Sequence, residues 1–162
     1  MKNHLILPLL TACLLLAGCG PKDQAATSTS AASAPAVATF EFTANDTMKY
    51  NLTRIEVKAG QDVKVILTNT GSMPKAAMAH NWVLLKKGTD GKAYTDAAVL
   101  AQATEYIPAA LADQVIIHTK MIGARQNDEI TFKAPTEPGE YPFVCTFPAH
   151  YLAGMHGVMV VK

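Results

Sequence analysis

Short segments in which apolar and polar residues alternate, each followed by turn residues, recur from Thr39 to the end of the chain. In the clearest segment, Val63, Val65 and Leu67 share one face of the predicted strand. A period of two is typical of half-buried β-strands, because successive side chains of a strand point to opposite faces. The pattern predicts about eight strands, which lie near residues 40–42, 55–57, 63–67, 81–86, 115–118, 130–132, 141–145 and 157–162.

Turn residues separate several of these segments, among them Gly60, Asp90-Gly91, Asn127-Asp128 and Pro138-Gly139. Eight short strands joined by turns favour two packed sheets, so we expect an all-β fold, an antiparallel Greek-key sandwich. Residues 96–112 depart from the pattern, because they are rich in Ala and Leu, contain no Gly, and include Pro108 as a stop. We expect one short helix there, in a flap outside the sandwich.

The N-terminus has the character of an export signal. A lysine is followed by an apolar run from Leu5 to Ala17, which is shorter than the roughly 20 residues that a membrane span needs. The run ends in Leu16-Ala17-Gly18-Cys19, which resembles a lipobox, so we expect residues 1–18 to be a lipoprotein signal peptide and Cys19 to be lipidated. Gly20 resembles a sorting signal for the outer membrane of a Gram-negative bacterium. An ordinary signal peptide, in which Cys19 has no role, is the alternative.

Residues 19–38 are dominated by Ala, Ser and Thr. This composition buries too little apolar surface to fold, so we expect a lipid-anchored tether in front of a folded domain at 39–162. The domain is then expected in the periplasm or at the cell surface. A disordered tail without a role is the alternative.

The cysteine and charge counts limit the classes of function that this chain can have. Of the three Cys, signal cleavage removes Cys13 and lipidation caps Cys19, which leaves Cys145 as the free thiol in an oxidising compartment. That thiol is a buried inert side chain, half of an intermolecular bridge or a metal ligand. The 14 Lys and Arg against 13 Asp and Glu exclude the strongly basic surface that a nucleic-acid binder shows.

Soft metal donors are concentrated in one predicted loop. Cys145, His150 and Met155 lie between two predicted strands, which would hold the ends of the loop together. His80 opens another apolar run, and in a Greek-key sandwich it can lie beside this loop. Two His and one Cys with a weak Met form the blue-copper arrangement, whereas structural zinc rarely uses Met and non-haem iron needs a carboxylate. We therefore expect one copper ion that cycles between Cu(I) and Cu(II).

Several segments resemble the azurins, which are blue copper proteins of the cupredoxin family. These segments are Asn45-Asp46-Thr47-Met48, Met73-Pro74-Lys75, Met78 to Leu84, Ile117 to Gly123, and Cys145-Thr146-Phe147-Pro148-Ala149-His150. The resemblance covers 39–162 and implies the cupredoxin Greek-key fold, a type 1 copper and periplasmic electron transfer. The lipobox and the tether are similar to those of lipid-modified azurins of the neisserial type.

The resemblance also implies the role of each ligand. His80, Cys145 and His150 are the expected strong equatorial ligands, and Met155 is the expected weak axial ligand. The backbone carbonyl of Ala79 is the expected distant fifth contact.

Two further residues follow from the same resemblance. Asn81 is expected to pin the two ligand segments together, and backbone groups near Asn81 and Phe147 are expected to hydrogen-bond the Cys145 sulfur. We expect His118 and His156 to lie outside the site.

The chain departs from the azurin pattern in several places. Azurins usually have Gly at the positions of Ala79 and Ala149. Four residues separate His150 from Met155, one more than in typical azurins and closer to auracyanins and plastocyanins. A histidine that responds to pH in some azurins is replaced by Asn69 or a neighbouring residue, so we expect no such switch.

Partners are expected at an apolar patch through which the His150 imidazole edge reaches the surface. The patch consists of Met48, Met78, Phe147, Pro148 and Leu152. Exposed apolar patches mark partner sites, and electron-transfer encounters are small and transient. The expected partners are therefore transient redox proteins, such as haem or copper proteins.

The predicted function is that of a type 1 (blue) copper electron carrier, which shuttles single electrons between periplasmic or outer-membrane redox partners. We expect no enzyme, because four protein donors leave no position for a substrate and the chain has no His-x-His pair for a second copper. The alternatives are a periplasmic copper chaperone or storage protein, and a lipid-anchored binding module without metal.

Overall fold

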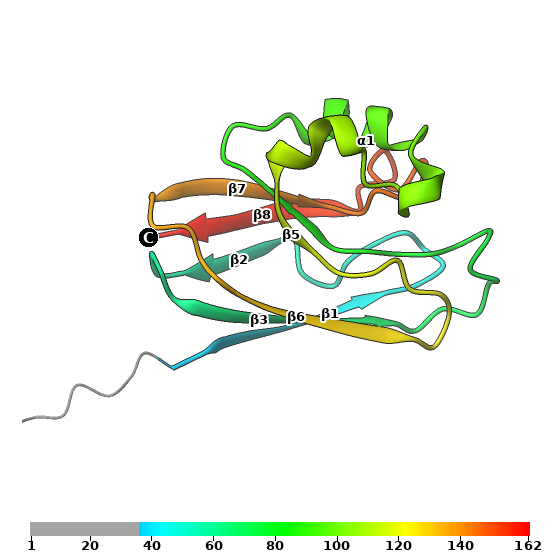
Figure 1. Ribbon diagram of the computed structural model, residues 1–162. Helices are drawn as coiled ribbons and strands as arrows, with labels where there is room; N and C mark the ends of the chain where they lie inside the picture. Colours follow the sequence, from blue (N-terminus) through cyan, green and yellow to red (C-terminus); the bar gives the residue numbers. More distant parts are fainter. Residues whose placement is uncertain (1–35) are drawn as a thin grey trace, which may run out of the picture. The chain divides into compact units, whose positions relative to one another are not determined.

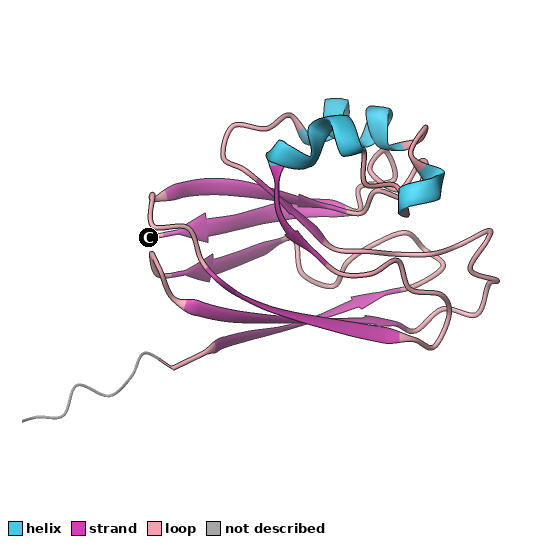
Figure 2. Ribbon diagram, in the orientation of Figure 1, coloured by secondary structure: helices cyan, strands magenta, loops and turns pink. Residues whose placement is uncertain are grey.

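A computed structural model describes residues 36–162 of the chain. The predicted signal peptide, Cys19 and most of the predicted tether lie outside these residues. Figure 1 follows the elements along the chain, and Figure 2 separates strands from helices. In chain order they are β1 (Ala38–Ala44), β2 (Arg54–Val57), β3 (Asp62–Asn69), β4 (Val83–Leu85), α1 (Gly91–Ala98), the 3₁₀ helices η1 (Gln102–Thr104) and η2 (Ala109–Gln114), β5 (Val115–His118), β6 (Asn127–Lys133), β7 (Gly139–Val144) and β8 (His156–Val161).

The strands predicted from the alternating pattern are confirmed, and they form two sheets. One sheet has the order β1-β3-β6 and the other the order β2-β8-β7-β4-β5. Along β3, buried residues alternate with partly exposed ones, and the buried set is the predicted Val63, Val65 and Leu67. β4 is buried on both faces, which explains why its sequence reads as a continuous apolar run.

The expectation of a wholly antiparallel sandwich is wrong for two pairs of strands. β1 runs parallel to β3, with Ala38 opposite Val63, and β2 runs parallel to β8, with Arg54 opposite Val158. The reason is that β2 belongs to the sheet opposite β1 and β3. The chain reverses direction at each end of the sandwich as it crosses over and back, so β1 and β3 point the same way. The other pairings are antiparallel.

The predicted flap lies outside the sandwich, but its helix begins earlier than expected. α1 begins at Gly91, because the side chain of Asp90 accepts hydrogen bonds from the Lys92 and Ala93 N–H groups and so caps the first turn. The sequence pattern predicts a turn at this position. Pro108 precedes η2 rather than ending a helix. Figure 2 shows the helices gathered on one side of the five-stranded sheet.

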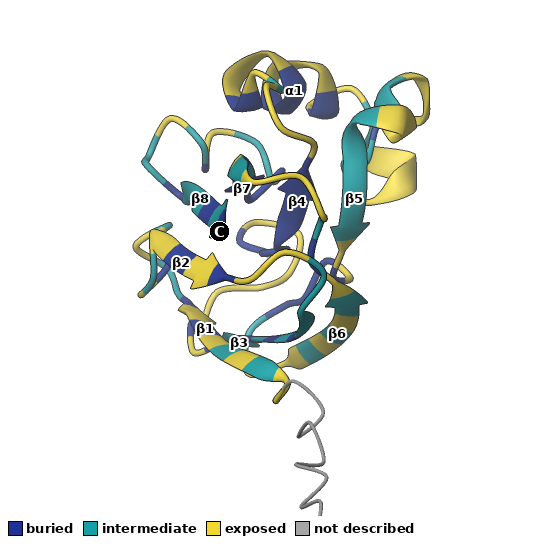
Figure 3. Ribbon diagram, turned by 90° about the vertical axis from the view of Figure 1, so that its left-hand side faces the viewer, coloured by how far each residue is buried: buried dark blue, intermediate teal, exposed yellow. Residues whose placement is uncertain are grey.

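Aromatic side chains are prominent in the core between the sheets. Figure 3 colours the ribbon of the buried residues dark blue. The ring of Trp82 lies 5.6 Å from that of Phe42 and 5.3 Å from that of Phe143, measured between centroids. Trp82 is fully buried and its indole N–H has no hydrogen-bond partner. Because Trp82 follows His80 by two residues, this packed core supports the first predicted ligand.

The connections that carry the predicted ligands lie at one end of the sandwich, opposite the C-terminus (Figure 1). They are the loop between β3 and β4 and the loop between β7 and β8. None of the helices within residues 36–162 has the length and hydrophobicity that spanning a membrane requires.

Candidate metal centre

His80 is held in place by the backbone of a neighbouring connection. Its N–H donates to the Ile122 carbonyl at 3.0 Å, and the Ile122 N–H donates back to the His80 carbonyl at 2.8 Å. This isolated bridge ties the loop before β4 to the connection between β5 and β6. The His80 side chain is completely buried.

The loop from Cys145 to Met155 is closed by its own backbone. β7 and β8 are paired up to Val144 and His156, so the loop begins and ends at adjacent positions, as the sequence predicted. Inside the loop, the Cys145 N–H donates to the Met155 carbonyl at 3.1 Å, and the Met155 N–H donates to the His150 carbonyl at 2.9 Å. These hydrogen bonds bring the ends and the middle of the loop together.

Ala149 shows why glycine is common at its position in azurins. Its φ is 69°, in the left-handed region that favours glycine. The His150 N–H donates to the Phe147 carbonyl at 3.1 Å across this turn. The tight turn is therefore retained here at some cost in backbone strain.

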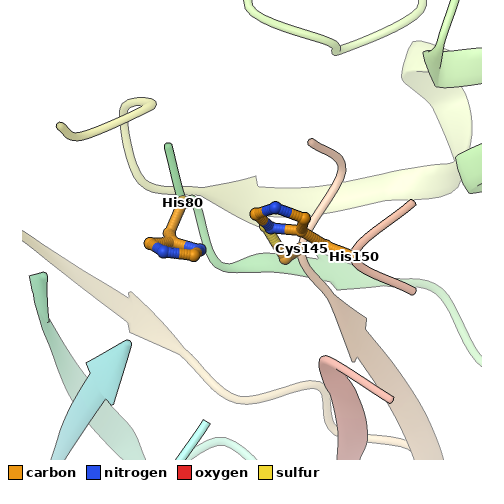
Figure 4. Close-up of side chains that lie close together, drawn as sticks. All are labelled: His80, Cys145 and His150. Carbon is orange, nitrogen blue, oxygen red and sulfur yellow. The ribbon is translucent and has the colours of Figure 1, made fainter. Parts of the chain in front are cut away.

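Three of the predicted donors converge, as Figure 4 shows. The ligand atoms of His80, Cys145 and His150 all lie within 4.8 Å of one another. The Cys145 sulfur is 3.4 Å from Nδ1 of His150, and the two imidazole ring centroids are 4.9 Å apart. Within residues 36–162 this is the one cluster of His, Cys and carboxylate side chains with metal-binding geometry.

The two histidines of the cluster are in the protonation state that metal binding requires. Burial lowers the pKa of His80 and of His150 to about 4, so both imidazoles are neutral at pH 7 and each keeps a lone pair for a metal. Neither ring nitrogen of His80 has a hydrogen-bond partner, although both are buried. An unpartnered buried nitrogen is costly, and a metal ion would satisfy it. The donor set therefore fits a soft metal ion such as copper.

The Cys145 thiol is prepared for the same role. Burial raises its pKa to about 12, and hydrogen bonds from the backbone N–H groups of Asn81 and Phe147 act in the opposite direction. These are the backbone groups expected from the sequence. Binding of a metal ion would release the thiol proton to solvent, and these N–H groups would stabilise the resulting thiolate.

Asn81 pins the two ligand segments together, as expected. Its side-chain NH₂ donates to the Thr146 hydroxyl at 2.8 Å, and its side-chain oxygen accepts from the Thr146 N–H at 2.9 Å. The Tyr50 hydroxyl donates to the Asn81 carbonyl. All three residues are buried, so His80 and Cys145 are joined through their immediate neighbours.

Replacing Asn81 with alanine should lower the free energy of unfolding by roughly 2–3 kcal/mol, because the buried Thr146 N–H and hydroxyl lose their partner. Chemical denaturation measures this loss. The matched control is Asn51→Ala, since Asn51 is exposed and also makes two side-chain hydrogen bonds, to Thr43 and Glu41. The control should lose less than about 1 kcal/mol. Equal losses in the two variants would contradict the pinning role.

The remaining predicted contacts lie at the same end. Met155 is completely buried at the close of the loop, and Ala79 is buried next to His80. His118 is exposed on β5, and the ring of His156 stacks on Tyr151 at 4.3 Å. Both therefore lie outside the three-donor cluster, as expected.

The expectation that the His150 edge reaches the surface is not met, because His150 is only 1% exposed. The ring of Phe147 packs against it at 4.8 Å, and the ring of Tyr106, from the flap, packs against Phe147 at 5.4 Å. The sequence pattern did not identify Tyr106, because only the folded flap brings it to the ligand loop.

The residues of the predicted apolar patch differ in their exposure to solvent. Leu152 is 71% exposed, whereas Met78 is buried. Met48, Phe147 and Pro148 are partly buried. Leu152 is thus the member of the patch that a partner meets first.

Comparisons with known proteins agree with this site. A family model described as "Copper binding proteins, plastocyanin/azurin family" matches residues 37–162. The chain is 40% identical over 138 residues to an azurin of Achromobacter denitrificans, across 80% of this chain and 90% of that protein. It is 39% identical over 108 residues to outer membrane protein H.8 of Neisseria meningitidis serogroup B, across 65% of this chain and 58% of that protein.

Solved structures agree with the fold. The dithionite-reduced auracyanin of Roseiflexus castenholzii matches with a TM-score of 0.68 and 36% identity, over 76% of this chain and 96% of that one. Auracyanin A of Chloroflexus aurantiacus, described as a "blue" copper protein, matches with a TM-score of 0.68 and 30% identity, over 78% and 100% of the two chains. The sandwich predicted from the sequence is the fold of these neighbours.

Proposed function

The chain belongs to the plastocyanin/azurin family of copper-binding proteins, with copper as its cofactor, and we propose from this that it is a type 1 (blue) copper electron carrier. The observation that carries the proposal is the convergence of His80, Cys145 and His150 within 4.8 Å, all of them buried. The similarity to blue copper proteins supports it.

Each donor has a role in the proposal. The two imidazoles and the Cys145 thiolate would hold the metal strongly, the Met155 thioether would be a weak ligand, and the Ala79 carbonyl would be a distant contact. When bound, copper supplies a one-electron couple between Cu(I) and Cu(II). Thiolate and thioether suit Cu(I), and imidazole suits both states, so one donor set serves both. The hydrogen bonds of Asn81 and of His80 hold the donors still, which keeps rearrangement on electron transfer small.

The proposal assigns no catalysis to the site. His80, Cys145 and His150 are 0–1% exposed, so no substrate reaches a metal held by them. Electrons, unlike substrates, cross such a barrier by tunnelling.

Metal analysis and visible spectroscopy of the purified protein test the function. We expect one copper per chain and an intense blue colour that disappears on reduction and returns on oxidation. A colourless site that binds only Cu(I) would instead support a copper chaperone or storage protein. Absence of copper binding would leave a binding module without metal.

The proposal places the protein at the outer membrane of a Gram-negative bacterium, held by a lipid on Cys19, with the domain at 39–162 in the periplasm or at the cell surface. The Leu16-Ala17-Gly18-Cys19 motif supports this, as does the similarity to outer membrane protein H.8. Labelling cells with a radioactive fatty acid tests it. The wild-type chain should incorporate the label, and Cys19→Ala should not.

Redox proteins, such as haem or copper proteins, are proposed to dock transiently at the patch around Leu152. Replacing Leu152 with aspartate should slow electron self-exchange about tenfold, because two like charges then meet across the contact. The blue spectrum should not change, since Leu152 is not a donor. Self-exchange is measured from NMR line broadening in mixtures of reduced and oxidised protein.

The matched control is Val37→Asp. Val37 is 52% exposed and precedes β1. Met48, a member of the patch around Leu152, follows β1, so Val37 and the patch lie at opposite ends of this strand. The control should exchange electrons at the wild-type rate. An unchanged rate in Leu152→Asp would remove Leu152 from the docking surface.

A further inference from the structure

Three aromatic rings connect the flap to the second histidine of the cluster. The ring of Tyr106 packs on Phe147, with 5.4 Å between the centroids, and Phe147 packs on His150 at 4.8 Å. Tyr106 and Phe147 are half-buried, whereas His150 is 1% exposed. On this side of the site, the two outer rings therefore separate the His150 imidazole from solvent.

The glutamate before this tyrosine contacts the segments that hold the first histidine. Oε2 of Glu105 accepts a hydrogen bond from the Met121 N–H at 3.2 Å, and Oε1 lies 3.1 Å from the ammonium nitrogen of Lys75. Met121 precedes the residue whose backbone bridges to His80, and Lys75 belongs to the loop between β3 and β4 that carries His80. Residues 105 and 106, which we call the flap tip, thus contact both histidine segments of the cluster.

The backbone of the flap tip is strained. The φ angle is 52° at Glu105 and 62° at Tyr106, in the left-handed region that favours glycine. Non-glycine residues keep such a conformation only where the surrounding contacts hold them in it. The contacts of the two side chains therefore fix the position of the tip.

A cavity of about 200 Å³ borders the flap tip. Both residues of the tip line it, together with Ala79 and Phe147. Ala79 precedes His80, and Phe147 packs on His150. The cavity therefore reaches a neighbour of each histidine, and the flap tip is one of its walls.

We propose that the flap tip controls access to the metal centre. Tyr106 is a positioning residue that holds Phe147 over His150, and Glu105 anchors the tip on the His80 side. Because the three donor residues are 0–1% exposed, part of the protein must move before a metal ion can enter, and the tip is the part that moves. This inference concerns entry to the site and goes beyond the proposed electron transfer, so its main tests use the metal-free chain.

Tyr106→Ala in the metal-free full chain tests the cover. We expect iodoacetamide to alkylate the Cys145 thiol about tenfold faster than in the wild-type chain, because loss of the ring frees Phe147 and opens the cluster. Mass spectrometry of the peptide that contains Cys145 separates this thiol from Cys13 and Cys19. Tyr106→Phe keeps the aromatic ring, so its Cys145 should react at the wild-type rate.

The matched control is Ile107→Ala. Ile107 is the next residue of the flap, but it packs against a different cluster, which consists of Val83, Leu85, Tyr94 and Val144. The control should react at the wild-type rate, and hydrogen exchange of the β3 amides should stay unchanged in every variant, since the opening is local. An unchanged rate in Tyr106→Ala, an equal acceleration in Tyr106→Phe or Ile107→Ala, or an acceleration with loss of β3 protection would overturn the cover.

The anchor is tested at Met121. Glu105→Ala should speed hydrogen exchange of the Met121 N–H at least tenfold, because this group loses its acceptor, and it should also speed alkylation of Cys145. Lys75→Met removes only the exposed ion pair, which contributes little, so both rates should stay near those of the wild-type chain. Unchanged exchange at Met121 in Glu105→Ala, or faster exchange without faster alkylation, would overturn the anchor.

Copper uptake tests the consequence for metal entry. After Cu(II) is added to the metal-free full chain, the blue colour should appear about tenfold faster in Tyr106→Ala than in the wild-type chain or in Ile107→Ala. Equal rates in the three chains would overturn the role of the tip in metal entry. Failure of the proposed function is a separate result, since it would appear as a wild-type chain that does not turn blue.

Discussion

Cys145→Ser is expected to abolish the blue Cu(II) centre while the sandwich stays folded. A neutral hydroxyl is a poor ligand for copper, and the thiolate is the donor that distinguishes a blue copper site. The fold should survive, because serine is close in size to cysteine and its oxygen accepts the hydrogen bonds that the Asn81 and Phe147 N–H groups now make to sulfur. Visible absorption after addition of Cu(II), with circular dichroism for the fold, measures both outcomes.

Met155→Leu is expected to differ from Cys145→Ser in its effect on the blue colour. If the thioether is the weak axial ligand, its loss should keep the blue colour, because Cys145 and both histidines remain. The expected change is in the reduction potential alone. Persistent blue colour in Cys145→Ser would contradict the assignment of the thiolate, and loss of colour in Met155→Leu would contradict the weak role of the thioether.

Acidification is expected to destabilise the metal-free protein by a few kcal/mol between pH 6.5 and pH 4. In the folded state, burial lowers the pKa of His80 and of His150 to about 4, whereas an unfolded chain has histidines that titrate near 6.5. Over this interval the unfolded chain binds more protons than the folded chain, so stability falls as pH falls. Above pH 6.5 His80 and His150 become neutral in the unfolded chain as well as in the folded chain. The two histidines then no longer contribute to the pH dependence of stability.

Denaturation followed by the fluorescence of Trp82, the single tryptophan, measures this dependence. The interval above pH 4.5 reports the histidines, because the carboxylates with lowered pKa values, Asp46, Glu56 and Glu105, lose their contribution at lower pH. His150→Gln should flatten the curve. The matched control is His118→Gln, an exposed position that should leave the curve unchanged. A flat curve for the wild-type chain would show that the two imidazoles are not held neutral by the fold.

The sequence predicted the strands well because their signal is local. A strand with one face in the core must alternate, and the alternation of Val63, Val65 and Leu67 is visible without any partner strand. The donors in the Cys145–Met155 loop are local in the same sense, since two paired strands hold the ends of a short loop together. The role of His80 came from resemblance to the azurins, because nothing near it in the chain shows that it meets Cys145.

Two of the errors of prediction have non-local causes, whereas the error in the start of α1 has a local one. The direction of β1 relative to β3 depends on the sheet to which β2 belongs, and no pattern within a strand encodes that choice. α1 begins at Gly91 because Asp90 caps it, but the dipeptide Asp90-Gly91 is equally typical of a turn. The burial of His150 depends on a ring from the distant flap.

The number of strands, the family and the donor types could be predicted without a structure, because these follow from periodicity and from motifs a few residues long. Only the folded structure shows which ligand atoms converge within 4.8 Å and how Asn81 joins the two ligand segments. The side chains of Asn81 and Thr146 are 65 positions apart in the chain, and their contact exists only once both sheets have packed.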